Sequence, residues 1–507
     1  MPMSPRTLPT VNELPRALYS AAQVRELDRQ AIERFGIPAA ELMERAGRAV
    51  FEALRQRWPE QGRLHVLAGT GNNAGDGFVV ARLAREAGLD ATVLQLGDRA
   101  RLRGDAADKA AAWSTQGGAW LDFERLPGDP GVIVDAVFGT GLERPVAGAW
   151  AAAVEAANAS RAPRVAVDIP SGLHADTGAV LGCAVRADLT VTFIGLKQGL
   201  FTADGPDCAG EIRFDSLGVP AAVYASTIAG ARRIDWRKQA GLLAPRRRNV
   251  HKGHFGHVVV VGGNRGMGGA ARIAAEAALR AGAGRVSLAT RPEHLAPVLA
   301  ARPEVMVHAV GDAAEVDALL RQASVVAIGP GLGRDDWARG LWERVLAAGR
   351  PLVVDADALH LLAQADVRRD DWVLTPHPGE AAALLGVCGA EIQSDRFGVV
   401  ARLQSRYGGS VVLKGCGSLV ASASAAPPAV CSDGNPGMAS GGMGDALTGV
   451  IAGLLAQGLD ARDAAECGTC LHAAAGDAAA AAGGERGLLA GDLMSHLRRL
   501  ANLVPAT

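Results

Sequence analysis

Short runs of β-branched residues alternate along most of the chain with glycine loops and Ala/Leu-rich stretches. In such a pattern each buried strand leads through a tight loop into a helix, so it predicts parallel sheets covered by helices. The strands expected in the first half are His65–Ala68, Ala91–Leu96, Val132–Ala136, Arg164–Val167 and Leu189–Phe193. Those expected in the second half are His257–Val261, Arg285–Ala289, Val325–Ile328, Leu352–Val354, Trp372–Leu374 and Ser410–Leu413. The sequence therefore predicts two α/β units.

The length of 507 residues excludes one small domain. The α/β pattern lapses between Gly218 and His251, where arginines and lysines collect, so we expect one domain over residues 17–228 and another over 235–505. The Ala/Pro-rich stretch Ala421–Ala429 lies between strand-like segments, and we expect a hairpin-like excursion there.

The charges of the chain nearly cancel, with 52 Lys and Arg against 53 Asp and Glu. No global field therefore attracts nucleic acid or an anionic membrane. The basic segment Arg246–Lys252 lacks interleaved aromatics, which favours a solvated edge or a local phosphate contact. No stretch of 18 residues is both uncharged and strongly apolar, so we expect no membrane span. Because the charges of the chain balance, we also expect no nucleic-acid partner.

The seven cysteines are odd in number and scattered, which is not the pattern of a disulfide framework. Cys467 and Cys470 form a CxxC, but no second CxxC accompanies it and no His follows it, so we expect structural cysteines on a helix. Residues Met1–Leu18 contain no apolar core of a signal peptide. These features favour a reducing, cytoplasmic setting.

The loop after the first expected strand, Gly69–Gly77, reads GTGNNAGDG and leads into a helical run, Phe78–Ala87. Backbone N–H groups at such a helix start bind anions. The loop fits the G-x-G-x-x-G/A spacing of a dinucleotide-binding turn, with Asp98 near the end of the second strand. Its asparagines and Asp76 would obstruct a pyrophosphate, which argues against an ordinary NAD dehydrogenase. They favour direct polar contact with a ligand or an ion.

Two further strand ends carry acidic residues: Asp135 precedes a Gly-Thr-Gly loop, and Asp168 begins an Asp-Ile-Pro-Ser-Gly sequence. Ligands of doubly wound sheets lie at the carboxyl ends of strands, so these loops and the asparagine-rich loop are expected to converge. Asn73, Asp135 and Asp168 would then offer hard oxygen ligands. Each carboxylate taken singly is equally typical of a helix N-cap or a turn.

Together these motifs resemble the NAD(P)H-hydrate epimerase domain, whose usual loop has glycine in place of Ala74. The resemblance implies a Rossmann-like doubly wound sheet with Asp168 as substrate-binding acid/base residue. It implies a potassium ion held by Asn73, Asp135 and Ser171. It also implies that the hydrated nucleotide contacts two segments, Asn72, Asn73, Ala74, Gly75 and Asp76, and Gly139, Thr140, Gly141, Leu142, Glu143, Arg144 and Pro145.

In the second half the segment Gly434–Asp445 reads GNPGMASGGMGD and leads into an apolar helix, Ala446–Leu455. Its small residues let backbone amides close around a developing phosphoryl charge. Asp445, in the first turn, can accept a proton from a substrate hydroxyl; the alternative, an N-cap, would need one residue and not a long glycine run. Lys414–Ser418 follows another strand and offers a cation suited to phosphate. Because no Walker A sequence is present, the pattern predicts nucleotide binding without a P-loop.

This loop, with His251-Lys-Gly, Gly329-Pro-Gly-Leu-Gly and Pro-His377-Pro-Gly-Glu, resembles the ribokinase-like ADP-dependent NAD(P)H-hydrate dehydratase. The resemblance implies a ribokinase-like α/β domain in which ADP, with magnesium, contacts Lys414, Gly415, Cys416, Gly417, Ser418 and Gly444. Cys416 stands where a smaller residue is common. The resemblance further implies that the hydrate contacts Ala270, Gly331, His377 and Asp445.

The two resemblances predict one bifunctional enzyme that repairs NADHX and NADPHX, the hydrated nicotinamide nucleotides. The first domain would interconvert R and S hydrates, and the second would dehydrate the S form with ADP, releasing AMP and phosphate. Two alternatives stay open: a sugar or vitamin kinase fused to a nucleotide-binding regulatory module, and a noncatalytic nucleotide sensor. Joint release of phosphate and AMP from a supplied hydrate would separate the first alternative from repair. We also expect a homo-oligomer.

Overall fold

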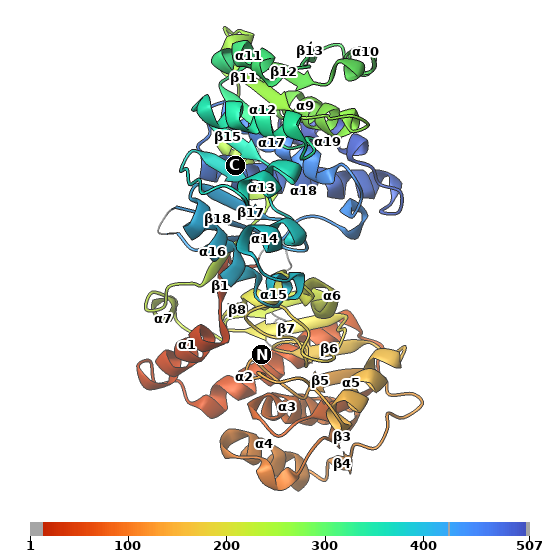
Figure 1. Cartoon of the computed structure of the whole chain (residues 1–507). Helices are drawn as coiled ribbons and strands as arrows, with labels where there is room; N and C mark the ends of the chain where they lie inside the picture. The colour runs from red at the N-terminus through yellow and green to blue at the C-terminus, as the bar shows by residue number, and fades with distance from the viewer. Residues whose placement is uncertain (1–13, 424–425, 503–507) are drawn as a thin grey trace. The chain divides into compact units, whose positions relative to one another are not determined.

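The computed structural model describes residues 14–423 and 426–502. The chain divides between Arg232 and Arg233 into an N-terminal and a C-terminal unit (Figure 1). The division lies within the charged segment between Gly218 and His251. Two sequence predictions fall partly outside the described residues: the absence of a signal peptide at residues 1–18 and the tip of the excursion at Ser424–Ala425.

The N-terminal unit contains seven hydrogen-bonded parallel strands. Their spatial order is β4 (Ala119–Asp122), β3 (Asp90–Gln95), β2 (Arg63–Ala68), β5 (Val132–Ala136), β6 (Arg164–Val167), β7 (Leu189–Phe193) and β9 (Glu211–Asp215). The five predicted strands of this half are present, within two residues at their ends. The edge strands β4 and β9 were not predicted because they are partly exposed and lack a continuous apolar run.

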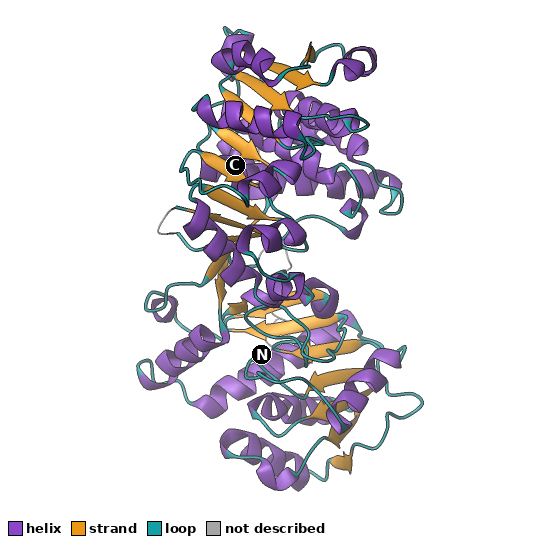
Figure 2. Cartoon of the chain, in the orientation of Figure 1, coloured by secondary structure: helices purple, strands orange, loops and turns teal. Residues whose placement is uncertain are grey.

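Helices cover both faces of this sheet, as the resemblance to a doubly wound fold predicted (Figure 2). The helices α2 (Ala39–Arg57), α3 (Asn72–Glu86) and α4 (Gly104–Thr115) share one core with Val66 and Val134. On the other face α5 (Ala149–Ala159) packs on Leu67 and Ile133. The strand order reverses between β2 and β5, and a crevice forms where loops leave such a point toward opposite faces.

A second group of strands begins in this unit, near α1 (Ala21–Glu33), and its last strand runs across the division at Arg232. The strand β1 (Ala17–Tyr19) pairs in parallel with β8 (Leu196–Lys197) and antiparallel with β10 (Ala231–Ile234). The Ser20 side chain caps α1 through a capping box with Gln23, which fixes where the helix begins. Two short helices, α6 (Gly205–Ala209) and α7 (Ala221–Tyr224), follow later in the unit.

The C-terminal unit repeats this plan with a longer sheet. Its strands lie in the order β13 (Met306–Ala309), β12 (Arg285–Thr290), β11 (His257–Val261), β14 (Val325–Ile328), β15 (Leu352–Val354), β16 (Trp372–Leu374), β17 (Ser410–Leu413), β18 (Ser418–Ser422) and β19 (Ala429–Cys431). The strands from β13 to β17 are parallel, and β18 and β19 are antiparallel. The β18–β19 pair confirms the predicted hairpin at Ala421–Ala429. The order again reverses, here between β11 and β14.

Helices pack on both faces of this second sheet as well. One core contains α9 (Gly268–Ala281), α17 (Met443–Ala456), α18 (Ala461–Gly483) and α19 (Leu493–Leu500). The other helices of the unit are α8 (Trp236–Gln239), α10 (Leu295–Ala301), α11 (Asp317–Gln322), α12 (Asp336–Ala347), α13 (Ala356–Leu362), α14 (Pro378–Leu385), α15 (Gly389–Ser394) and α16 (Arg396–Tyr407). Cys467 and Cys470 are free and buried on α18, which confirms the prediction that they are structural cysteines on a helix. Among the described helices none has the length and hydropathy to cross a bilayer.

The helices α9 and α17 approach each other closely through small residues. A Cβ atom on Gly449 would overlap the backbone carbonyl oxygen of Ala274 and lie 2.8 Å from the Ala277 Cβ. Neither helix can therefore accept a larger residue at this contact without a backbone shift.

We predict that Gly449→Leu lowers the free energy of unfolding of the C-terminal unit by about 3 kcal/mol, because overpacking forces the two helices apart. Calorimetric unfolding of the full chain measures this loss. Gly483→Ala, on α18 with open space around it, is the matched control and should leave stability unchanged or slightly raised. Equal stability of the Gly449→Leu chain would contradict the close packing.

Candidate functional site

A cavity of about 820 Å³ opens in the N-terminal unit, around the loops that follow β2, β5 and β6. Its place at the reversal of strand order is where doubly wound sheets bind ligands. The predicted residues that line it are Asn72, Asn73, Asp76, Gly139, Thr140, Gly141, Leu142, Glu143, Arg144 and Asp168. Ala74, Gly75 and Pro145 are not among the residues that line this cavity. The three loops therefore converge as predicted.

The asparagine-rich segment is helical, which corrects the prediction that it forms a loop before a helix at Phe78. The helix α3 begins at Asn72, with Gly71 as an extended N-cap residue. Asparagine and glycine have low helix propensity, but tertiary packing overrides it here. A Cβ on Gly75 would lie 2.5 Å from the Met43 sulfur, so the small residues let α3 pack closely on α2. Asn72, Asn73 and Asp76 consequently reach the cavity from the first turns of a helix.

Asp168 forms an ion pair with a buried lysine that was not predicted from the sequence. The Lys197 ammonium forms an ion pair with Asp168 Oδ1 and donates to Thr192 Oγ1 at 3.0 Å and to the Phe193 carbonyl at 3.1 Å. Only 1% of the Lys197 side chain is exposed. Lys197 is the single charged residue of the apolar stretch Leu189–Phe201, and that isolation was the available signal.

The Asp168 backbone has a φ of +68°, a region that residues other than glycine seldom occupy and that often marks functional sites. The Phe193 N–H donates to Asp168 Oδ1 at 3.2 Å. Its carboxylate is thus fixed by β7 and Lys197. Within the described chain it makes no hydrogen bond to the turn at Pro170, which was the alternative role considered for it.

The carboxyl groups of Asp28 from α1 and Asp76 from α3 also line this cavity. Burial raises the pKa of Asp28 to about 6; the Lys197 charge lowers it and the Asp168 charge raises it. Burial, together with the charges of Asp168 and Asp28, raises the pKa of Asp76 well above its usual value. Asp28 lies far from the glycine motifs in sequence and was not predicted as a site residue.

Asn73, Asp135 and Ser171 lie together, as the resemblance implied. Asp135 accepts from the Ser171 N–H at 2.7 Å and from the Ser171 hydroxyl at 2.6 Å. The Asn73 Nδ2 donates to the Phe138 carbonyl at 3.0 Å, which leaves its Oδ1 without a donor in the described chain. Asp135 is fully buried and forms no ion pair with a described residue; burial raises its pKa to about 6. A buried carboxylate without a cation, amid neutral oxygen atoms, fits a hard monovalent ion.

The C-terminal unit gathers its own charged cluster around Lys414. The Lys414 ammonium lies 2.7 Å from Asp355 Oδ1 and 3.7 Å from Glu380 Oε2. The Thr448 hydroxyl donates to Asp355 Oδ2 at 2.7 Å. Although burial raises the pKa of Asp355, Lys414 and these hydrogen bonds hold it below its usual value. Lys414 was predicted as a cation available to phosphate, whereas here two carboxylates already compensate its charge.

Asp445 lies in the first turn of α17, as predicted. Burial raises the pKa of its carboxyl to about 6; the Asp355 charge raises it further, and Lys414 lowers it. The preceding residue, Gly444, brings the backbone close to the ion pair: a Cβ there would lie 3.1 Å from Lys414 Nζ. The helix therefore presents a carboxylate and its N-terminal N–H groups beside the half-buried Lys414 cation.

His377 is the N-cap of α14 and belongs to the same cluster. Its Nδ1 accepts from the N–H groups of Gly379 at 3.0 Å and Glu380 at 3.2 Å, so the neutral ring carries its proton on Nε2. The Nε2 atom lies 3.3 Å from Glu380 Oε1. Burial and the Lys414 charge lower the pKa of His377, and burial raises that of Glu380 to about 7.

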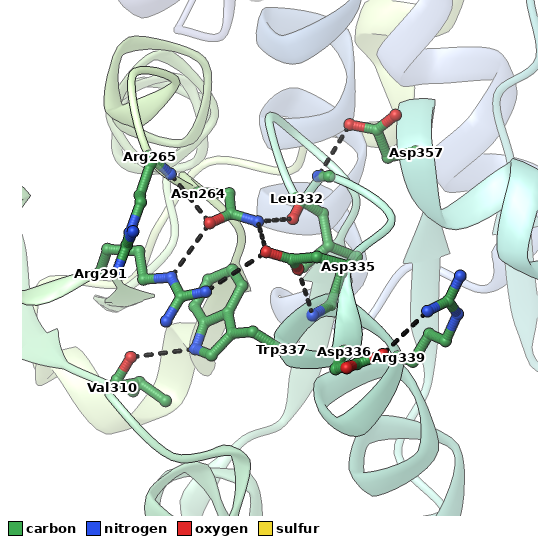
Figure 3. A network of polar contacts seen from close by, with 12 residues as sticks. Asn264, Arg265, Arg291, Val310, Leu332, Asp335, Asp336, Trp337, Arg339 and Asp357 are labelled. Carbon is green, nitrogen blue, oxygen red and sulfur yellow. Dashed lines mark hydrogen bonds and ion pairs between the residues drawn. The ribbon is translucent and has the colours of Figure 1, made fainter.

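The two glycine loops at the strand reversal of this unit are joined by a polar network (Figure 3). The Asn264 Nδ2 donates to the Leu332 carbonyl at 3.1 Å and to Asp335 Oδ2 at 3.0 Å, and Arg291 Nε donates to Asn264 Oδ1 at 3.0 Å. A Cβ on Gly331 would lie 3.3 Å from the Ala270 Cβ. The predicted contacts Ala270 and Gly331 are thus side by side.

Of the predicted segment Lys414–Ser418, residues 414–417 connect β17 with β18, and Ser418 begins β18. The buried Arg396 donates to the carbonyls of Leu413 at 3.3 Å and Lys414 at 3.2 Å, which anchors the start of this connection. Gly415 and Gly417 have positive φ angles of 138° and 60°. Cys416 is exposed.

Two family models match the chain, one in each unit. A model described as NAD(P)H-hydrate dehydratase matches residues 258–499, and one described as YjeF-related protein N-terminus matches residues 39–199. The bifunctional NAD(P)H-hydrate repair enzyme Nnr of Coxiella burnetii is 49% identical over 486 residues, 96% of this chain and 99% of that protein. The enzyme of the same description from Escherichia coli is 45% identical and covers 96% of this chain and 95% of its own.

A solved structure with a similar fold is a ribokinase-like superfamily protein of Enterococcus faecalis. It is 30% identical, has a TM-score of 0.50, and covers 54% of this chain and 95% of its own. A Streptococcus mutans protein of 28% identity has the same TM-score and covers 53% of this chain and 98% of its own. The predicted ribokinase-like fold of the C-terminal unit is confirmed by these structures.

We predict that Asp168→Asn lowers the free energy of unfolding of the N-terminal unit by about 3 kcal/mol, since it leaves the buried Lys197 ammonium without a carboxylate. Calorimetric unfolding measures the loss. Adding Lys197→Met should restore at least half of it, because the unpaired charge is then gone.

The matched control is Asp90→Asn, which breaks the exposed ion pair between Asp90 and Arg63 and should cost less than about 1 kcal/mol. If Asp168→Asn cost no more than this control, the ion pair would not be buried as described.

Proposed function

The chain belongs to the family of bifunctional NAD(P)H-hydrate repair enzymes, and from this premise we propose which of its residues carry the two reactions. Its function is the repair of hydrated NADH and NADPH by an epimerase and an ADP-dependent dehydratase. The observation that carries this conclusion is 49% identity over 96% of the chain, which spans both units. We assign the epimerase to residues 17–228 and the dehydratase to residues 235–505.

The cavity of the N-terminal unit is the proposed epimerase site. The hydrate contacts α3 at Asn72, Asn73 and Asp76, and the loop Gly139–Arg144 on the other side of the strand reversal. Asp168 faces the hydrated carbon and moves a proton, while Lys197 fixes the direction of its carboxylate. This role is supported by the location of both residues in the cavity lining and by the constrained Asp168 backbone.

Asn73, Asp135 and Ser171 are the proposed ligands of a potassium ion in this unit. When bound, the ion supplies a positive charge that compensates the buried Asp135 carboxylate. The hydrogen bonds of Ser171 to Asp135 and of the Phe138 N–H to Ser171 at 2.8 Å tie this group to the loop that lines the cavity. The ligands thereby order the loop that receives the substrate.

In the proposed dehydratase site Asp445 accepts the proton of the hydrate hydroxyl. The hydroxyl oxygen then attacks the β-phosphorus of ADP, which enters with magnesium, and AMP leaves. The phosphate ester departs as inorganic phosphate when the ring loses a neighbouring proton and regains its double bond. A carboxyl with a pKa of about 6 is mostly ionised at neutral pH and can serve as this base.

The other predicted contacts of this unit are distributed around Asp445. Ala270, Gly331 and His377 face the hydrate, and Lys414, Gly415, Cys416, Gly417, Ser418 and Gly444 face the nucleotide. We propose two roles for Lys414. Its ion pair with Asp355 holds the charged cluster in position, and its ammonium also offers a positive charge to phosphate. Similarity over both units favours repair over the kinase and sensor alternatives.

We place the enzyme in the cytoplasm, which its seven free cysteines support. Its substrates are the two hydrates and ADP, and homo-oligomerisation stays a prediction. No contact with nucleic acid or membrane is part of the proposal.

We predict that Asp445→Asn lowers ADP-dependent dehydration at least about a hundredfold, because the positioned base is lost. Epimer interconversion should be unchanged, since it belongs to the other unit. Both rates are measured on the full chain with mixed hydrate epimers, with and without ADP, by following NAD(P)H absorbance and epimer ratio.

Asp336→Asn is the matched control for this variant. Asp336 also lies in the first turn of a helix of the C-terminal unit, but its side chain is fully exposed, so both rates should equal those of the parent chain. Normal dehydration by a folded Asp445→Asn chain would remove Asp445 from the chemistry.

We also predict that epimerisation requires a small monovalent cation. Replacing potassium by tetramethylammonium at constant ionic strength should lower the epimerisation rate, because the large cation cannot approach the Asp135 carboxylate. Epimer ratios followed by chromatography measure the effect. Equal rates in both salts would eliminate the ion from the proposed site.

A further inference from the structure

Three carboxyl groups surround one buried ammonium in the cavity of the N-terminal unit. Asp28, Asp76 and Asp168 come from α1, α3 and the end of β6, and Lys197 is the one buried cation among the described residues of the lining. Lys197 pairs with Asp168 alone. Within the described chain, the carboxyl groups of Asp28 and Asp76 form no hydrogen bond or ion pair with another residue. The cavity therefore holds two carboxyl groups without a direct partner, whose charge the Lys197 ammonium compensates only in part.

Burial raises the pKa of such carboxyl groups, because it disfavours a charge that is only partly compensated. The pKa values of the two carboxyl groups are raised to different degrees. The pKa of Asp76 lies well above its usual value, whereas that of Asp28 is about 6, since Lys197 offsets part of the effect of burial and of the Asp168 charge. Asp76 is therefore a weaker acid than an exposed aspartate. Asp28 exchanges its proton near neutral pH, as a general acid must.

The proposed epimerisation requires a general acid. Hydration of an enamine places the hydroxyl on the carbon attached to nitrogen, and inversion there can proceed by loss and return of that hydroxyl. Hydroxide is a poor leaving group, so the departing oxygen requires a proton. Asp168 cannot readily provide it, because its carboxylate is the partner of the Lys197 ammonium.

We propose that Asp28 is the general acid of the epimerase, acting in the same cavity as the base Asp168. The inference rests on the proposed function of that cavity. Asp28 lies on the face of α1 that lines the cavity, together with Val24 and Ile32, one turn to either side. The sequence signal for this role is weak, because the helix is far from every glycine motif.

The proton transfers balance as follows. The C–O bond breaks with its electron pair going to oxygen, the Asp28 proton joins that oxygen, and water forms as the nitrogen lone pair makes a C=N bond. Water then adds to the opposite face, the C=N electrons return to nitrogen, and the released proton passes to Asp168. The carboxyls now hold the protonation state that drives the reverse conversion, and exchange with solvent resets them.

The test uses the full chain, pure S hydrate and no ADP, with the epimer ratio followed by chromatography. Asp28→Asn keeps the size of the side chain but removes the acidic proton. We expect kcat for epimerisation to fall about a hundredfold or more, with KM changed by less than about twofold. Asp28→Glu should recover at least a tenth of the parent kcat. ADP-dependent dehydration of the S hydrate by each variant should equal that of the parent chain.

Glu33→Gln is the matched control, since Glu33 lies on the same helix, is exposed and does not line this cavity. It should epimerise at the parent rate. Parent kcat in Asp28→Asn, a rise in KM alone, or no recovery in a folded Asp28→Glu chain would overturn the role of Asp28. Absence of epimerisation in the parent chain would instead contradict the proposed function of the cavity.

Discussion

A parallel sheet whose strand order reverses cannot close the space above its reversal point, because the two loops that leave it turn to opposite faces. Both units of this chain are built on such a sheet. In the N-terminal unit the reversal lies between β2 and β5, and in the C-terminal unit between β11 and β14. The glycine-rich loops follow these four strands, since only small residues let the backbone turn from strand to helix in so little space. The location of each site is therefore a consequence of strand order.

Burial of charge then decides what each site can do. In both units a buried or half-buried lysine pairs with a buried or half-buried aspartate: Lys197 with Asp168, and Lys414 with Asp355. Each pair fixes one carboxylate as an anion beside its cation. Neighbouring carboxyls receive less compensation, and burial raises the pKa of Asp28 and of Asp445 to about 6. Such groups can give or take a proton near neutral pH, which an ordinary surface aspartate does poorly.

The strands and loop positions could be predicted because their signals are local. A strand buried on both faces requires a continuous apolar run. Residues 258–261 of β11 and 132–134 of β5 form such runs, whereas the partly exposed β4 has none. Asp445 was assigned to the first turn of a helix correctly, since an uninterrupted apolar helix follows it. The helical start at Asn72 was missed because packing against Met43, and not local propensity, stabilises it.

The partners within each site could not be predicted, because they come from distant segments. Nothing near Asp168 in sequence indicates Lys197, and nothing near Lys414 indicates that Asp355 and Glu380 compensate its charge. Sequence motifs indicate which side chains lie at the crevice. The ionisation of those side chains depends on how many charges arrive there and how deeply they are buried, which only the assembled fold determines.

The spacing of small residues links the core of the C-terminal unit to its chemistry. Ala270 lies in the first turn of α9, and Asp445 lies in the first turn of α17. One turn further along these helices lie Ala274 and Gly449, respectively. Gly449 contacts the Ala274 backbone so closely that a Cβ there would overlap its carbonyl oxygen, and Gly453 repeats the approach at Ala278 one turn later, where a Cβ would lie 2.7 Å from the carbonyl oxygen. Two helices in backbone contact cannot slide or separate without losing packing along their length. The distance between the proposed substrate contact and the proposed base is therefore set by glycines that touch neither substrate nor nucleotide.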